Sequence, residues 1–214
     1  THYAFTCGGV DLKVTFTAPL FMEDLKLLSR PVNYLTYSVA ARDGREHEVE
    51  VYFEASPRWA LDQPYQQSAS KGYEADGLLY LKSGSKEQNI LAKQGDDLRI
   101  DWGYFYMVAG KENTAYSVGN STELRKNFVN GTLNSASLEG EDSNGNMALV
   151  RSHGKVKNVT DKIMLGYDDI YSIQYFGTNL RPYWNSKGDR TIEAEMLAAY
   201  NEYDKLLARC YAFD

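Results

Sequence analysis

Apolar and polar residues alternate one by one along two separate stretches of this chain. In residues 10–17, two valines, a leucine and a phenylalanine alternate with Asp11, Lys13 and two threonines. In the second stretch the apolar Val49, Val51 and Phe53 alternate with the acidic Glu48, Glu50 and Glu54. A period of two residues is that of a β-strand, and charges at every second position place one face of the sheet in water. We therefore expect the two valines and Phe53 to face a core and the three glutamates to face solvent.

Further strand-like runs follow, separated by turn sequences. They cover residues 32–41, 78–82, 89–92, 98–108, 147–151, 163–167 and 170–176. In the 98–108 run, one face of a single long strand would carry Leu98, Ile100, Trp102, Tyr104, Tyr106 and Val108. Asp43-Gly44 and Asn144-Gly145 are hairpin signals, because such pairs tolerate the positive φ angles of tight turns. Many short strands joined by turns indicate a mainly β fold, an antiparallel β-sandwich over residues 1–187.

A short helix is expected at residues 121–129. Asn120 can cap its first turn, and Glu123 stands three residues later, as in a capping box. Leu124 and Phe128 form an apolar i, i+4 pair on one side of this helix.

A long C-terminal helix is expected at residues 189–213, with Asp189 as its N-cap. Its apolar stripe consists of Ile192, Met196, Tyr200, Tyr203, Leu207 and Cys210. A helix of this length at the end of a β domain is typical of a linker, so we expect residues 188–214 to lead into a helical domain. The alternative is that the helix packs back on the sandwich.

The charge pattern and hydropathy argue against two classes of partner. The formal net charge is −6 and the basic residues form no cluster, whereas a nucleic-acid surface needs clustered lysine and arginine. No apolar run approaches the roughly 18 residues of a membrane helix. We therefore expect neither nucleic acid nor membrane as a partner. Cys7 and Cys210 permit either a disulfide or two free buried thiols.

Enzymatic motifs are absent from the sequence. It holds no HExxH, CxxC or GxSxG and no phosphate-binding or dinucleotide-binding glycine pattern. Residues 142–153 fail the calcium-loop pattern, because Met147 and His153 stand where glycine and glutamate are required. His47, between two glutamates of an expected strand, is interpreted as a surface residue. We assign no catalytic residue, no metal ligand and no cofactor.

Two sets of residues remain open to interpretation. The acid pairs Asp96-Asp97 and Asp168-Asp169 could act on a glycosidic bond, although such pairs are more often turn and strand-end residues. Aromatic residues gather at 102–106 and at Tyr183-Trp184. Exposed rings could stack on sugars or fill a protein interface, whereas the alternative is that they belong to the core and rim of the sandwich.

Three runs of the sequence are long enough to be specific. The first is LLSRPV at residues 27–32 with Tyr34-Leu35, and the second is GDDLRIDWGY at residues 95–104. The third is YDDIYSIQYFG at residues 167–177, followed by LRPYW at residues 180–184. In this order the runs resemble the glutaminase A family, known from secreted fungal enzymes and from bacterial, often Bacteroides-type, proteins.

The resemblance implies a β domain near the N-terminus of a longer hydrolase, followed by a six-hairpin-like helical domain. It implies a parent that converts L-glutamine to L-glutamate and ammonia, in an extracellular or periplasmic location. No catalytic residue of the family can be placed on this sequence, so we expect the chain alone to be inactive. Because glycoside hydrolases share this supersandwich-like layout, the alternative is an accessory or carbohydrate-contacting domain of such a parent. A third hypothesis is a self-sufficient enzyme.

Residues 167–184 are the expected contact region with the downstream helical domain, because they lead directly into the C-terminal helix. The candidate interface or ligand-contact residues are Asp168, Asp169, Tyr171, Arg181, Tyr183 and Trp184. We also expect the apolar stripe of the C-terminal helix to face that domain.

Overall fold

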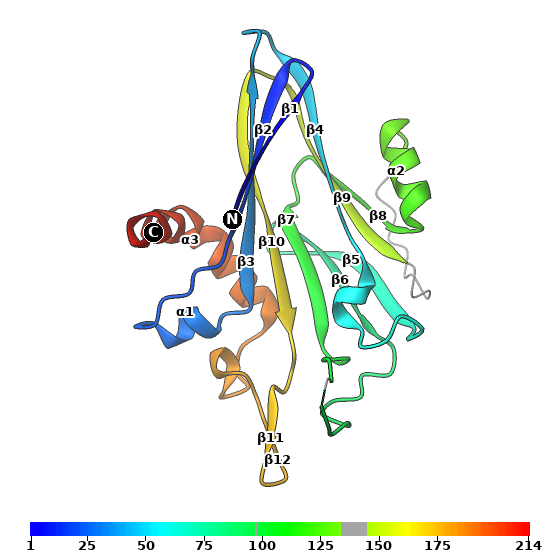
Figure 1. Ribbon diagram of the computed structural model, residues 1–214, viewed down its shortest axis with the longest axis vertical. Helices are drawn as coiled ribbons and strands as arrows, with labels where there is room; N and C mark the ends of the chain where they lie inside the picture. Colours follow the sequence, from blue (N-terminus) through cyan, green and yellow to red (C-terminus); the bar gives the residue numbers. More distant parts are fainter. Residues whose placement is uncertain (97, 134–144) are drawn as a thin grey trace.

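The computed structural model describes residues 1–96, 98–133 and 145–214 (Figure 1). Asp97 of the first acid pair and residues 142–144 of the calcium-like loop lie outside the described residues. Within them the fold is mainly β and antiparallel, with a short helix and a long C-terminal helix, as predicted.

A large antiparallel sheet forms the middle of the molecule. Its seven strands in the described part of the chain are, in spatial order, β1 (His2–Cys7), β2 (Val10–Thr17), β3 (Val32–Ala41), β10 (Asn158–Asp168), β7 (Tyr104–Gly110), β6 (Leu78–Ser85) and β5 (Ser68–Ala75).

A smaller sheet, a separate hairpin and five helical segments complete the described structure. The small sheet has the order β4 (His47–Ala55), β9 (Asn146–Val156) and β8 (Thr114–Gly119), and the hairpin pairs β11 (Ile173–Tyr175) with β12 (Thr178–Leu180). The helical segments are α1 (Leu25–Ser29), η1 (Pro57–Ala60), α2 (Ser121–Val129), η2 (Tyr183–Asn185) and α3 (Ile192–Phe213).

Two cores lie on the two faces of the large sheet. The core between the sheets includes Leu35, Tyr37, Leu81, Phe105, Met107, Met147, Leu149 and Ile163. The core between the large sheet and α3 includes Tyr34, Tyr80, Tyr106, Met164, Met196, Ala199, Tyr203 and Leu206. Successive residues of a strand, such as Tyr34 and Leu35, therefore enter different cores. A sheet covered on both faces also explains why Leu78–Leu81 is a continuous buried run.

The alternation in β4 is confirmed except at its last glutamate. Val49 is buried, Val51 and Phe53 pack against the core between the sheets, and Glu48 and Glu50 are exposed.

Glu54, by contrast, is covered by α2, so its expected exposure to solvent is wrong. Its carboxylate accepts hydrogen bonds from Arg125 at 2.8 Å and from the hydroxyl of Tyr52 at 2.9 Å. Phe128 of α2 packs on the ring of Tyr52, with 4.9 Å between ring centres. The polar face of this strand is therefore half solvated and half covered by a helix.

A single strand over residues 98–108 is wrong, because β7 begins only at Tyr104. Leu98 and Ile100 precede the strand and are exposed. Gly103 has a φ of +76°, which breaks the extended backbone just before β7. The strand expected at residues 89–92 is also wrong, since these residues lie in turns.

Helix α2 has the predicted bounds and the predicted cap. The side chain of Asn120 accepts hydrogen bonds from the amides of Thr122 and Glu123. Helix α3 begins three residues later than expected, and its N-cap is Thr191 rather than Asp189: the Thr191 hydroxyl accepts a bond from the Ala194 amide at 3.2 Å.

The apolar stripe of α3 lies on the large sheet (Figure 1). Met196 and Tyr203 are buried there, and the hydroxyl of Tyr34 donates to the Ala199 carbonyl oxygen at 2.8 Å. The expectation that this stripe faces another domain is therefore wrong, and the alternative of a helix packed back on the sandwich is confirmed. That residues 188–214 also lead into a helical domain stays a prediction.

Both cysteines are free: Cys7 is exposed on β1, and Cys210 is buried on α3. The disulfide interpretation is wrong, and so is the expected burial of Cys7. No helix in the described ranges combines the length and the apolar character needed to cross a membrane.

Candidate functional site

Three neighbouring strands of the large sheet meet at one end of it. β3 begins at Val32, β7 begins at Tyr104 and β10 ends at Asp168. The strand register pairs Val32 with Gly166 and Tyr104 with Asp168. The segments that adjoin these strand ends are the three runs that carry the family resemblance, residues 27–35, 95–104 and 167–184. We call this region, which combines segments far apart in the sequence, the motif end.

The second and third runs interlock at Trp102 and Gly103. A Cβ atom on Gly103 would lie 2.2 Å from the carbonyl oxygen of Asp168, so only glycine fits there. The indole Nε1 of Trp102 donates to the carbonyl oxygen of Tyr171 at 2.9 Å. The hydroxyl of Tyr167 donates to the carbonyl oxygen of Trp102. These contacts fix the loop that follows β10.

The first run is tied to α3 through Arg30. Its guanidinium pairs with Glu195 at 3.1 Å and with Glu202 at 2.8 Å. Glu195 is buried and also forms an ion pair with Arg190. Because a buried carboxylate without a partner is costly, these arginines hold the beginning of α3 at the motif end.

Asp101 is a buried residue of the second run that sequence reasoning missed. Its carboxylate accepts hydrogen bonds from Lys93 at 2.9 Å and from Gln66 at 2.9 Å. Lys93 also reaches Asp62 at 3.2 Å. The run holds three other charged residues, so nothing in the local sequence distinguishes Asp101 as the buried one. The contacts indicate a structural role, since they anchor the loop before β7.

Asp168 is half-buried at the end of β10. Burial raises the pKa of its carboxyl above the usual range, although the Ile170 amide, which donates to it at 3.0 Å, acts in the opposite direction. Burial also lowers the pKa of Lys82, whose Nζ lies 3.6 Å from the centre of the Tyr104 ring. The motif end therefore holds titratable groups with shifted pKa values. Asp168 accepts a backbone hydrogen bond, Lys82 lies over the Tyr104 ring, and the attraction between the two charges opposes the effect of burial on both pKa values.

The other sequence candidates divide between surface and core. Asp169 follows Asp168 and is half-buried, and the guanidinium of Arg181 stacks 4.9 Å from the centre of the Tyr171 ring. Tyr183 is 55% exposed, whereas Trp184 is only 4% exposed, because η2 packs against α1. Trp184 is therefore enclosed by this chain itself, and Tyr183 is open to a partner.

The hairpin β11–β12 projects from the motif end, away from the body of the domain (Figure 1). It carries four exposed apolar side chains, Ile173, Tyr175, Phe176 and Leu180. The amide of Ser172 donates to the carbonyl oxygen of Leu180 at 2.9 Å and closes the base of the hairpin. No other part of the described chain covers this apolar surface.

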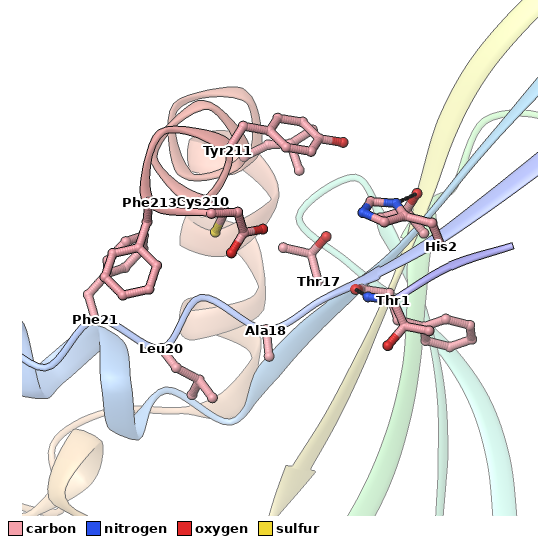
Figure 2. Close-up of a pocket in the computed structure, with 13 residues that line it drawn as sticks. Thr1, His2, Thr17, Ala18, Leu20, Phe21, Cys210, Tyr211 and Phe213 are labelled. Atoms are coloured by element: carbon pink, nitrogen blue, oxygen red, sulfur yellow. Dashed lines mark hydrogen bonds between the residues drawn. The ribbon is translucent and has the colours of Figure 1, made fainter.

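A cavity of about 300 Å³ lies where the N-terminal strands meet the end of α3 (Figure 2). His2, Thr17, Phe21, Cys210 and Tyr211 are among the residues that line it. Burial raises the pKa of the Cys210 thiol. A thiol that stays protonated is a poor nucleophile, so this cavity gains no reactive cysteine from it.

A second hollow, of about 560 Å³, opens over the face of the large sheet that points toward the small sheet. Its aromatic lining comes from Phe16, Trp59, Phe105 and Tyr167. Trp59 is exposed, and its ring centre lies 5.1 Å from that of Phe105. An exposed tryptophan in an aromatic hollow is the kind of surface on which a sugar ring can stack.

The histidines are engaged in pairs that stabilise the sheets. His2 lies 3.0 Å from the hydroxyl of Thr15, and His47 lies 3.0 Å from the carboxylate of Asp43. His153 lies 2.7 Å from the hydroxyl of Tyr37. Among residues 1–96, 98–133 and 145–214, no three His, Cys, Asp or Glu side chains come together as a metal site requires.

Fold and site together define a mainly β, antiparallel domain in which the three sequence runs meet at one end of the large sheet. The chain belongs to the family described as "Domain of unknown function (DUF5127)", whose model matches residues 1–214.

Among curated proteins, the chain is similar to glutaminase A of Aspergillus oryzae (strain ATCC 42149 / RIB 40). The two are 28% identical over 180 residues, which cover 78% of this chain and 25% of that protein. The resemblance to glutaminase A seen in the three runs is thus confirmed, and the match spans about a quarter of the relative's length.

Among solved structures, the chain is similar to one assigned to a kojibiose phosphorylase from the human microbiome. The TM-score is 0.40 at 7% identity, and the match covers 92% of this chain and 19% of that chain. A TM-score this low carries no argument about function.

Proposed function

We propose that this chain is the non-catalytic β domain of a glutaminase A-like hydrolase and that it supports the helical part of the parent chain by packing against it. The observation that carries the proposal is the composition of the motif end. The three runs that resemble glutaminase A converge there, and they present an exposed apolar hairpin. An exposed apolar patch of this kind is typical of an interaction surface.

The test is ammonia release from L-glutamine, measured on the 214-residue chain and on the full-length parent. The chain is expected to give no turnover, whereas the parent is expected to turn over glutamine in the ordinary enzyme range of about 1–10³ s⁻¹. Turnover by the isolated chain at that level would overturn the non-catalytic role. A parent without glutaminase activity would overturn the assignment of the hydrolase.

The aromatic hollow supports a second candidate function, contact with carbohydrate. Trp59 stands exposed beside Phe105 in a hollow large enough for a sugar unit. If this function is right, soluble oligosaccharides should quench tryptophan fluorescence of the chain, and Trp59→Ala should abolish the response. If none of the oligosaccharides tested changes the fluorescence of the wild-type chain, this candidate function is ruled out.

The family resemblance also supports a location outside the cytoplasm, extracellular or periplasmic. Fractionation of cells that express the full-length parent tests this proposal. Recovery of the parent only from the cytoplasm would contradict it.

A further inference from the structure

The tip of the β11–β12 hairpin presents two aromatic rings to solvent. Phe176 is 89% exposed and Tyr175 is 61% exposed. Their ring centres lie 4.5 Å apart in an edge-to-face arrangement, so the two side chains form one apolar knob. Ile173 and Leu180 extend this apolar surface toward the base of the hairpin.

The backbone at the tip of the hairpin is strained. Phe176 has a φ of +46° and is followed by Gly177 at +78°, in a two-residue turn where asparagine and glycine are the favoured residues. A bulky residue at positive φ is in a conformation that L-residues rarely adopt. Ile170, which precedes the hairpin, is β-branched and also has a positive φ of 60°. Strain of this kind that persists at an exposed position points to a function for the side chain.

The base of the hairpin is held firmly, although the tip is free. The loop between β10 and β11 is anchored where Trp102 donates to Tyr171, and Arg181 stacks on the Tyr171 ring. A two-stranded hairpin alone is marginally stable in water, so such an anchor is needed to present the tip in one orientation. Around the base lie the charged Asp168, Asp169 and Arg181. An apolar knob with a charged surround has the arrangement of an interface core with its polar rim.

We propose that the Tyr175–Phe176 knob inserts into an apolar pocket of the helical part of the parent chain, as the anchor between the two domains. This inference rests on the proposed function and names the partner of the motif end. The matched relative extends far beyond this domain, because the match covers only 25% of it.

A stable pair of separate proteins buries about 800 Å² on each side, which is more than one short hairpin offers. Domains of the same chain need less, because the covalent link gives a high effective concentration. The small size of the knob therefore favours the parent chain over a second copy.

The substitution Phe176→Asn tests this proposal because its effect on the melting temperature of the β domain should differ in sign between the 214-residue chain and the full-length parent. Asparagine accepts a positive φ more readily than phenylalanine, so the 214-residue chain, which has two cores of its own, should melt at the same temperature or higher. In the full-length parent the same substitution removes the anchor, so the β domain should melt at a lower temperature. The matched control is Val129→Asn at the end of α2, which replaces another exposed side chain (81%) at a site away from the motif end. This control should act alike in both proteins.

Each other outcome counts against the proposal. An equal effect of Phe176→Asn in both proteins would mean that the knob contacts nothing in the parent. A wild-type 214-residue chain that sediments as a dimer, and becomes monomeric with Phe176→Asn, would assign the knob to a second copy instead. This test measures melting temperatures and does not depend on the activity assay. If the parent proves to have no glutaminase activity, the melting temperatures still decide whether the two domains are in contact.

Discussion

Gly103 is the residue on which the geometry of the motif end depends most directly. It combines a left-handed backbone with a contact that leaves no room for a side chain. Both properties come from the crossing of two segments that are about 65 residues apart in the sequence.

Gly103→Ala should therefore lower the free energy of unfolding by roughly 2–4 kcal/mol, since it adds a clash with the Asp168 carbonyl to an unfavourable φ. Gly177→Ala is the matched control, because Gly177 has a similar φ of +78° with nothing near its Cβ position. The control should cost only about 1 kcal/mol, the backbone contribution. Urea melts of the two variants measure the difference, and equal losses would contradict the close packing of the two runs.

Asp168 makes a prediction about pH. Its pKa is raised in the folded state by burial, so the folded protein holds this proton more tightly than the unfolded chain. The associated stability is fully present below the ordinary pKa near 3.8 and is lost as the pH rises through the raised value.

Asp168→Asn removes this pH-dependent loss and keeps an acceptor for the Ile170 amide. The variant should therefore be at least as stable as the wild type at pH 7, and its advantage should shrink as the pH approaches 4. Thermal melts across that range measure it, with Glu48→Gln, which removes the same charge at an exposed position, as the control. If Asp168→Asn instead lowers the melting temperature more at pH 7 than at pH 4, the ionised carboxylate stabilises the folded protein and the prediction is wrong.

Among the elements, α3 has the largest effect on the architecture, because it turns a two-layer sandwich into three layers. Its inner side is part of the second core, and its outer side is polar, with Asn201, Glu202, Asp204 and Lys205 exposed. The helix is therefore a structural part of the β domain.

Met196→Ala should cost roughly 2–5 kcal/mol, because Met196 is fully buried between α3 and the large sheet. Lys205→Ala, on the exposed side of the same helix, should change stability by less than about 0.5 kcal/mol. Denaturant unfolding of both variants measures these values. Equal, small effects would mean that α3 detaches from the sheet in solution.

The elements that could be predicted from the sequence are those with local signals. β2 and β4 alternate with period two, and α2 carries its cap and its apolar pair within ten residues. β5 and β8 were missed because their residues are polar or mixed, and pairing with neighbouring strands supplies what local propensity does not.

The motif end likewise combines features with a local sequence signal and features that depend on contacts with other parts of the chain. The segment 167–184 is identifiable by its run of large side chains, and Tyr183 is exposed, whereas its role as an interface residue stays a prediction. The burial of Trp184 depends on α1, and the anchoring of the loop before β7 depends on Asp101 reaching Lys93 and Gln66. Long-range contacts of this kind leave no periodic pattern in the sequence.

For the whole molecule, the hairpin is one of several places where a neighbour could bind through apolar contacts, because Tyr3 and Phe5 on β1 and Tyr211 and Phe213 on α3 are exposed as well. The middle of the large sheet is covered on one face by the small sheet and on the other by α3, whose outer side is polar except at its end, where Tyr211 and Phe213 are exposed. The hairpin β11–β12 extends beyond these layers at the motif end (Figure 1). The proposed contact with the helical part of the parent chain would form on these exposed apolar residues.

Hydrogen exchange of the segment Ile173–Leu180, compared between the 214-residue chain and the full-length parent, tests the central claim most directly. The hairpin should exchange quickly in the chain alone and should be protected at least about tenfold in the parent, because the docked tip opens to solvent only when the domains separate. α2, which lies away from the motif end, serves as the internal reference and should exchange alike in both. Protection of the hairpin in the parent, with α2 unchanged, is the predicted result, and equal exchange of the hairpin in the two proteins would contradict the account.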